Sequence, residues 1–363
     1  MSVYIGATRQ NDGKTVVSLG LLSVLRRKIK NIGYMKPIGQ QYLIVNGRKI
    51  DKDAVLMQKI FNFKSALPDM SPIAIPSGFT ENYILRGKRS TLVRKIQSSY
   101  KRLRQKHDFV LIEGTGHAGV GSVFDMSNSD VAHLLKTKVI IVSCGGIGKP
   151  IDEIMLNCAT FINRGVEIIG VIVNKVKEEK YNKINRFVTK GLARKNVDVL
   201  GVIPFENILS NPTISELLED LDGELLFGET GLDRVVERFV IGDMVAHECL
   251  NYLSGGTLLI VPGNRQDIIF SALSGWVLGV GKKYHISGII ATYGKKPPKN
   301  VVEIIKKAGI PLILVKGDSF TTACEIDRMI FKLRAEDKDK IIKTEELIRK
   351  YVDVDKIIEK VNG

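Results

Sequence analysis

The chain opens with an apolar segment, a polar loop and a second apolar segment in direct succession, and this order leaves few folds open to it. Residues 3–7 are apolar, and residues 8–13 are polar and end in Gly13. Gly13-Lys14-Thr15 then leads into residues 16–29, a helical pattern with Val17, Leu21, Leu22 and Leu25 on one stripe. A strand, a tight loop and a helix in this order surround an anion with backbone N–H groups at the positive end of the helix dipole. The pattern predicts a phosphate-binding loop in an α/β fold.

The residue types in this loop suit a triphosphate and its divalent ion. Lys14 would reach the outer phosphates, and the Thr15 hydroxyl would hold magnesium. The spacing departs from the usual motif, because Thr8 stands five residues before Gly13 where a glycine is usual, and Gly6 lies further back. We expect the nucleotide to contact one continuous run: Arg9, Gln10, Asn11, Asp12, Gly13, Lys14, Thr15 and Val16.

Two further apolar segments are followed by, or end in, a charged residue. Lys36 comes directly after residues 31–35, and Glu113 ends the apolar run 109–112. Carboxyl ends of parallel strands meet at one edge of a sheet, where α/β proteins bind ligands. Buried strands rarely end in an acid for packing reasons, so Glu113 is a candidate metal contact beside the loop. A surface turn remains the alternative interpretation of Lys36.

Asp53 completes the candidate metal ligands. It lies in the first turn of a predicted helix for which Asp51 is a suitable N-cap, so capping accounts for Asp51 and leaves Asp53 available to an ion. Asn174 follows the apolar segment 166–173. It can contact the nucleotide base or simply occupy a turn, and the residues alone leave both interpretations open.

The charge distribution raises the question of nucleic-acid binding. Residues 1–110 hold 21 Lys/Arg against 6 Asp/Glu, which accounts for the whole net charge of +15. Aromatic residues make up only 7%, and the densest basic run, 86–106, has the spacing of a solvated helix face. We therefore expect no nucleic-acid partner. Neither an export signal nor an apolar run of ~20 residues is found, so we expect a cytoplasmic protein that does not bind membranes.

Apolar segments alternate with helical patterns along most of the chain, which predicts a parallel sheet covered on both faces. The alternation is interrupted by an acidic, glycine-containing stretch at 213–235. We place the first domain at residues 1–222 and a second, smaller α/β domain at 223–363. In the second domain, the turn with Arg265 and Asp267 is either an anion site or, as we favour, a turn held by its own ion pair.

The first ~220 residues resemble dethiobiotin synthetase and the related P-loop ligases, which include cobyrinic acid a,c-diamide synthase. The likeness is greatest to the synthetase-like N-terminal region of long phosphotransacetylases, and residues from about 230 on resemble the DRTGG domain that follows it there. The motifs that carry the resemblance are Thr8-x-x-x-x-Gly13-x-Thr15, Ser18-Leu19-Gly20, Lys36-Pro37-Ile38, Asp53-Ala54, Glu113-Gly114-x-Gly116 and Asn174 in the first part, and Ile241-Gly242-Asp243-Met244 and Gly263-Asn264-Arg265-x-Asp267 in the second.

This resemblance implies a P-loop NTPase domain of the dethiobiotin synthetase type followed by a DRTGG-like, regulatory domain. ATP and Mg²⁺ are the implied cofactors, with Lys14 and Lys36 as catalytic residues and Thr15, Asp53 and Glu113 as metal ligands. It also implies a homodimer, in which Arg9 takes the place of a lysine that reaches a partner's phosphate in MinD/ParA-type relatives.

Two departures fall on the substrate side of the resemblance. Gln40 stands where the synthetase has a serine, and His117 replaces the last glycine of its acidic loop. The resemblance therefore implies nucleotide binding without dethiobiotin synthesis, and it does not name the acceptor. We expect a Mg-ATP-binding protein that transfers phosphoryl groups to a carboxylate. The alternative is a non-catalytic nucleotide- and metabolite-sensing regulator related to the N-terminal part of phosphotransacetylase.

Overall fold

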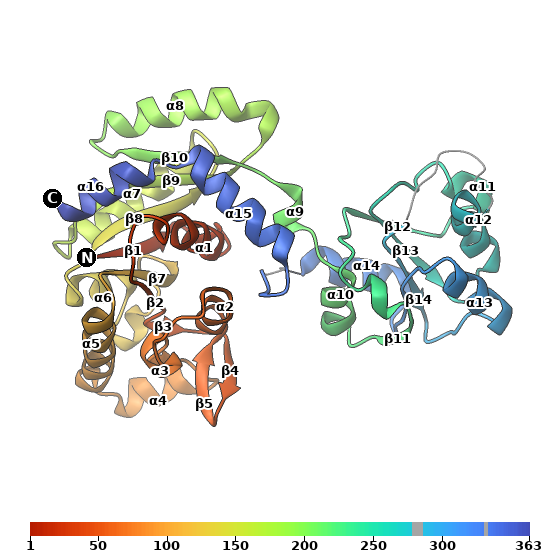
Figure 1. Ribbon diagram of the computed structural model, residues 1–363, viewed down its shortest axis with the longest axis horizontal. Helices are drawn as coiled ribbons and strands as arrows, with labels where there is room; N and C mark the ends of the chain where they lie inside the picture. The colour runs from red at the N-terminus through yellow and green to blue at the C-terminus, as the bar shows by residue number, and fades with distance from the viewer. Residues whose placement is uncertain (278–285, 330–332) are drawn as a thin grey trace. The chain divides into compact units, whose positions relative to one another are not determined.

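The computed structural model describes residues 1–277, 286–329 and 333–363, which form two units (Figure 1). The first unit contains residues 1–206 together with 333–363, and the second contains residues 207–332. Each unit is an α/β structure with its own sheet, so the predicted fold class is confirmed. Among the described residues, no helix has the length and apolar character that crossing a membrane requires.

A sheet of six strands, in the order β10-β9-β8-β1-β7-β2, forms the centre of the first unit, and all five of its strand pairs are parallel. The central strands are buried along their whole apolar length, which is why their sequences lack the alternation of half-exposed strands. The strands are β1 (Ser2–Ala7), β2 (Ile32–Met35), β7 (Phe109–His117), β8 (Lys138–Cys144), β9 (Ile168–Val176) and β10 (Val199–Pro204).

Helices cover this sheet, and two short two-stranded sheets lie beside it. The helices of residues 1–206 are α1 (Lys14–Leu25), α2 (Lys52–Phe61), α3 (Leu67–Met70), α4 (Phe79–Arg86), α5 (Arg89–Lys106), α6 (Asn128–Leu134), α7 (Lys149–Ile162) and α8 (Tyr181–Ala193). The short sheets pair β3 (Ile38–Gly39) with β6 (Ile73–Ala74), and β4 (Tyr42–Val45) with β5 (Arg48–Asp51).

The C-terminal helices α15 (Lys338–Tyr351) and α16 (Val354–Asn362) belong to the first unit, which differs from the expected second domain of 223–363. Ile348 of α15 packs against α1 at Gly20, where an added Cβ would lie 2.3 Å from Ile348 Cγ1. Val352 pairs with Gly201 of the edge strand β10. These helices thus pack against the first sheet and its helix α1, and Figure 1 shows α15 beside α1.

The described residues of the second unit contain a five-stranded sheet in the order β11-β15-β14-β13-β12, in which β11 and β15 pair antiparallel and the other neighbours pair in parallel. The unit begins before the expected boundary, because Ile214 and Leu217 of α10 pack in its core. Its described strands are β11 (Glu224–Phe227), β12 (Arg238–Ile241), β13 (Thr257–Pro262), β14 (Gly288–Thr292) and β15 (Leu312–Leu314), and its described helices are α9 (Asn207–Ser210), α10 (Ile214–Asp220), α11 (Ala246–Cys249), α12 (Gln266–Val277), α13 (Lys299–Lys307) and α14 (Ser319–Arg328).

Candidate functional site

The loop between β1 and α1 is a tight turn that leads directly into the helix. Gly13 precedes α1 with φ +93°, a left-handed conformation that glycine adopts without strain. A Cβ at Gly13 would lie 2.2 Å from Asn174 Nδ2, so a larger residue would displace the loop or Asn174. The Asp12 carboxylate holds the turn, accepting from Thr8 Oγ1 at 2.6 Å and from the Arg9 backbone N–H at 2.7 Å.

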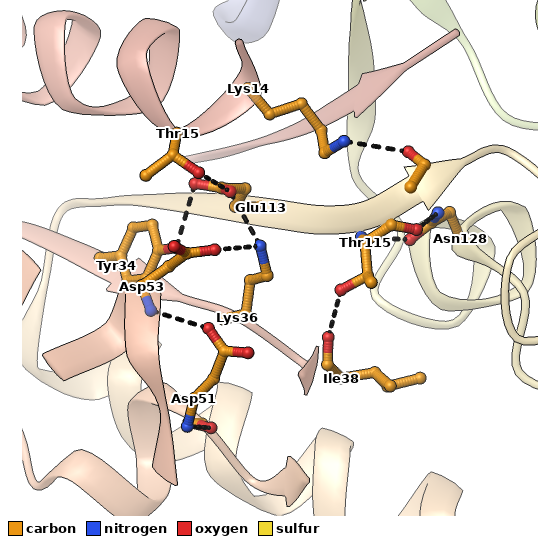
Figure 2. Close-up of polar contacts among 12 residues, drawn as sticks. Lys14, Thr15, Tyr34, Lys36, Ile38, Asp51, Asp53, Glu113, Thr115 and Asn128 are labelled. Carbon is orange, nitrogen blue, oxygen red and sulfur yellow. Dashed lines mark hydrogen bonds and ion pairs between the residues drawn. The ribbon is translucent and has the colours of Figure 1, made fainter. Parts of the chain in front are cut away.

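Lys14 is the first residue of α1, and its side chain turns toward the C-terminal end of β7 (Figure 2). Its Nζ donates to the Gly116 carbonyl oxygen at 3.1 Å. Burial, followed by the charge of Lys36, lowers the pKa of Lys14 to about 8. An ammonium held in so unfavourable an electrostatic environment is stabilised by an anion that reaches it.

Four side chains from different elements meet beside Lys14, as Figure 2 shows. Lys36 Nζ lies 2.7 Å from Asp53 Oδ2 and 2.8 Å from Glu113 Oε1. Thr15 Oγ1 donates to the same Glu113 oxygen at 2.9 Å. The candidate metal ligands predicted from the sequence, Thr15, Asp53 and Glu113, are therefore brought together around the Lys36 ammonium group.

The burial of this cluster governs its electrostatics. The side chains of Lys36, Asp53 and Glu113 are 6%, 9% and 0% exposed. Burial alone would lower the pKa of Lys36, but the neighbouring Asp53 and Glu113 carboxylates outweigh it and hold that pKa above its usual range. The ammonium compensates the two carboxylates, which would otherwise be costly to bury.

Local sequence explains how each side chain reaches the cluster. Lys36 directly follows β2, and Glu113 lies on the neighbouring strand β7. Asp51 is the N-cap of α2, with its Oδ1 accepting from the Asp53 backbone N–H at 2.9 Å, so Asp53 occupies the first helical turn. Burial raises the pKa of Asp51 to about 6. The cap fixes the start of α2 and therefore the position of Asp53.

These side chains suit Mg²⁺ better than they suit a metal ion whose ligands all come from the protein. Two carboxylates and one hydroxyl supply oxygen atoms, and Mg²⁺ characteristically takes one or two carboxylates and completes its shell with water and phosphate oxygens. Among the described residues, no cluster of three or more His, Cys, Asp and Glu side chains has the arrangement of a metal site. The position between the carboxylates already accommodates one cation, the Lys36 ammonium.

The remaining predicted nucleotide contacts lie on the loop or beside it. Arg9 is exposed and donates through Nε to Glu153 Oε2 at 2.5 Å, while Gln10 and Asn11 are exposed and Val16 is half-buried. Asn174 is buried, and its Nδ2 donates to the Asp12 carbonyl oxygen at 3.0 Å. Asn174 therefore holds the loop between β1 and α1 in position.

Two residues that hold groups of the site in position were not identified from the sequence. Tyr34 Oη donates to Glu113 Oε2 at 3.1 Å, and Tyr34 had the appearance of an ordinary core residue of an apolar strand. Asn128 holds the C-terminal end of β7, accepting from the Thr115 backbone N–H at 3.0 Å and donating to the His117 carbonyl oxygen at 2.6 Å. The available signal for Tyr34 was its polar hydroxyl group in the otherwise apolar strand that leads to Lys36.

The turn after β13 in the second unit is closed by its own ion pair. Arg265 Nε and Nη2 each lie 2.9 Å from a different oxygen of the Asp267 carboxylate. Arg265 Nη2 also donates to the Met244 carbonyl oxygen at 3.0 Å. The structure therefore supports the interpretation of this turn as one held by its own ion pair.

Two families of known domains match this chain in succession. Residues 1–213 match the family described as "AAA domain", and residues 216–329 match the family described as "DRTGG domain". The resemblance drawn from the motifs, a dethiobiotin synthetase-like P-loop domain followed by a DRTGG domain, is confirmed.

Individual relatives agree with these matches. A phosphate acetyltransferase of Nitratidesulfovibrio vulgaris is 28% identical, over 97% of this chain and 50% of that protein. The ATP-dependent dethiobiotin synthetase of Methanocaldococcus jannaschii is 27% identical, over 55% of this chain and 92% of that protein. The MinC:MinD complex of Aquifex aeolicus superposes with a TM-score of 0.37 at 15% identity, covering 57% of this chain and 83% of that one. The chain spans about half the length of the phosphate acetyltransferases that it matches.

Proposed function

This chain belongs to the AAA domain family, and from that premise we propose that its first unit binds ATP with magnesium and transfers the terminal phosphoryl group to a carboxylate. One observation carries the proposal. Thr15, Asp53 and Glu113 meet at Lys36, immediately beside the Gly13-Lys14-Thr15 loop. A phosphate cradle and an oxygen-rich cation site in contact with each other are what a metal-bound triphosphate requires.

The chain's own residues have separate roles in this proposal. The backbone N–H groups of the loop and of the first turn of α1 bind the phosphates, and Lys14 leaves the Gly116 carbonyl to pair with the outer ones. Magnesium, when bound between Thr15, Asp53 and Glu113, supplies charge neutralisation at the phosphates. Lys36 turns from the carboxylates to the group being transferred and stabilises its charge. No side chain serves as a covalent nucleophile.

The relatives support ATP as the nucleotide. The Methanocaldococcus jannaschii protein is named an ATP-dependent dethiobiotin synthetase, and its match covers 55% of this chain. The acceptor follows from the resemblance to P-loop ligases, which activate carboxylates. Gln40 and His117 differ from the synthetase pattern on the acceptor side, so we propose an acceptor other than the dethiobiotin precursor.

A second candidate function is favoured by the phosphate acetyltransferase match, which covers 97% of this chain but 50% of the relative. In this alternative the first unit binds nucleotide without turnover, the DRTGG unit binds a metabolite, and the two together regulate an acyl-phosphate enzyme. We propose a cytoplasmic homodimer for either function. Arg9, which is exposed, is the residue that would reach a phosphate bound by the second copy.

Calorimetry with ATP in the presence and absence of Mg²⁺, together with phosphate release, tests the proposal. The wild-type protein is expected to bind ATP more tightly with Mg²⁺, and Lys14→Ala is expected to lose that binding. Lys190→Ala, an exposed lysine of α8, is the matched control and should bind as the wild type does. Binding without phosphate release across a panel of carboxylates favours the regulatory alternative, and absence of ATP binding by the wild type contradicts both.

A further inference from the structure

Strand register places Tyr34 next to Glu113. β2 and β7 are parallel, and Tyr34 pairs with Leu111. Paired residues in neighbouring strands project from the same face, as do residues two apart along a strand. Tyr34, Leu111 and Glu113 therefore share one face of the sheet, and the tyrosine ring reaches along that face to the carboxylate. The same register puts Tyr4, which pairs with Ile112, on the opposite face.

The contact between Tyr34 and Glu113 is fully buried and directional. Both residues are 0% exposed, and Tyr34 Oη lies 3.1 Å from Glu113 Oε2. The phenol O–H is the donor of this hydrogen bond, because an ionised carboxylate only accepts. An uncharged donor behind a buried carboxylate holds the orientation of that carboxylate.

The two oxygens of Glu113 consequently face different partners (Figure 2). Oε2 accepts from Tyr34, while Oε1 accepts from Thr15 Oγ1 at 2.9 Å and from Lys36 Nζ at 2.8 Å. Oε1 is thus the oxygen that contacts Thr15 of the loop and the ammonium shared with Asp53. For Glu113 to present both oxygens to an ion, the carboxylate would have to rotate and give up the bond to Tyr34.

We propose that Tyr34 is a positioning residue that restricts Glu113 to a single metal-binding oxygen and thereby selects Mg²⁺ over Ca²⁺. This inference rests on the proposed magnesium site and adds its metal specificity. Mg²⁺ requires near-octahedral geometry with single carboxylate oxygens, whereas Ca²⁺ takes six to eight oxygens and readily accepts both oxygens of one carboxylate. A carboxylate fixed to one oxygen favours the smaller ion.

The test compares Tyr34→Phe with Tyr4→Phe, using calorimetric affinity for ATP in saturating Mg²⁺, in saturating Ca²⁺ and in EDTA. Tyr4 is the matched control, because it is a buried tyrosine of the same sheet whose Oη donates to Asn128 at 2.7 Å. Loss of a group that orients a metal ligand typically costs about 10–100-fold in metal affinity. We expect the ratio of Mg²⁺-supported to Ca²⁺-supported affinity to fall at least ~10-fold in Tyr34→Phe and to stay unchanged in Tyr4→Phe.

The outcomes separate this inference from the function on which it rests. Failure of the wild type to bind ATP more tightly with Mg²⁺ than in EDTA overturns the proposed function. A wild type that responds to Mg²⁺, with an unchanged Mg²⁺/Ca²⁺ ratio in Tyr34→Phe, overturns the role of Tyr34 alone. A crystal structure of the wild type with ATP and Ca²⁺ tests the inference without depending on the folding of a variant. Single-oxygen coordination by Glu113, with Oε2 still on Tyr34, supports the inference, and two-oxygen coordination contradicts it.

Discussion

The ammonium group of Lys36 lies 2.7 Å from the carboxylate of Asp53, and only 6% and 9% of the two side chains are exposed. Glu113 contacts the same ammonium, so one buried cation compensates two buried acids. Such a cluster is weak evidence for stability as a whole, but the removal of one member leaves an uncompensated charge. In the proposed function, the same arrangement keeps the carboxylates together until a metal ion replaces Lys36 between them.

Replacement of Lys36 by methionine tests this compensation. Lys36→Met retains most of the volume but leaves Asp53 and Glu113 facing each other, so we expect a loss of about 3–5 kcal/mol in the free energy of unfolding. Urea denaturation at pH 7 measures it. Lys59→Met is the control, because its partner Glu336 lies 3.5 Å away and both side chains are well exposed. The control should change by less than about 1 kcal/mol, and an equal loss in both variants would argue against the role of burial.

The left-handed glycine of the phosphate loop offers a second test. In Gly13→Ala, the added Cβ meets Asn174 Nδ2 at 2.2 Å and the backbone must hold φ +93°. We expect a loss of at least ~10-fold in ATP affinity, because a shift of about 1 Å in a positioned site has effects of this size or more. Gly47→Ala is the matched control, since φ is +73° there and no atom lies within 4 Å of the added Cβ.

The control separates backbone strain from local crowding. Gly47 lies in the hairpin between β4 and β5, so Gly47→Ala should cost about 1 kcal/mol in stability and leave ATP affinity unchanged. Equal ATP affinities for Gly13→Ala and the wild type would show that the loop geometry is not needed for nucleotide binding.

His107 gives a pH dependence of stability. Burial, followed by the charge of Lys106, lowers the pKa of His107, and its Nε2 lies 2.6 Å from Ser65 Oγ. Because the folded-state pKa is below the unfolded value of about 6.5, the unfolded chain binds more protons between the two values. The free energy of unfolding should therefore fall as the pH drops below about 6.5.

The variant His107→Gln isolates this contribution. Urea denaturation from pH 7 to pH 5 should show a shallower decline in His107→Gln than in the wild type. His133→Gln, at an exposed position of α6, should keep the wild-type slope. An unchanged slope in His107→Gln would mean that other groups produce the acid sensitivity.

Much of the first unit was predictable because a few residues have strong local preferences. Gly13 ahead of an apolar helix, Lys36 after a strand and Glu113 at the end of a buried run each indicate the carboxyl edge of a parallel sheet. The edge rule alone then predicts that they meet, and the structure places Lys36 and Glu113 2.8 Å apart. Asp53 was predictable from the cap at Asp51, which accepts from its backbone N–H.

The parts that were missed depend on contacts between distant segments. Residues 338–351 form the amphipathic helix α15, but the sequence does not indicate which surface its apolar side covers. We assigned it to the second domain, and it packs on α1 of the first. Tyr34 was missed for a related reason, because a tyrosine in an apolar strand is ordinary core composition until the register places its hydroxyl beside Glu113.

The contact between α1 and α15 leads to a last prediction, because α1 begins at the phosphate loop. Gly20 of α1 lies so close to α15 that an added Cβ would be 2.3 Å from Ile348 Cγ1 and 3.0 Å from the Thr344 carbonyl oxygen. Gly20→Ala therefore forces the helices apart, and overpacking of this kind costs about 1–3 kcal/mol. Denaturation of Gly20→Ala should show that loss in spite of the higher helix propensity of alanine.

A second substitution shows whether the loss comes from this one contact. Ile348→Ala removes Cγ1, the atom that the added Cβ would meet at 2.3 Å, so Gly20→Ala with Ile348→Ala should be more stable than the sum of the two single losses predicts. Residues in direct contact show coupling energies of about 0.5–3 kcal/mol in such cycles. Gly191→Ala on α8, whose added Cβ would approach only Ile151 Cδ1 at 3.0 Å, is the control for a flexible neighbour. Strict additivity of Gly20→Ala and Ile348→Ala would place the strain elsewhere, at the Thr344 carbonyl, which no side-chain change relieves.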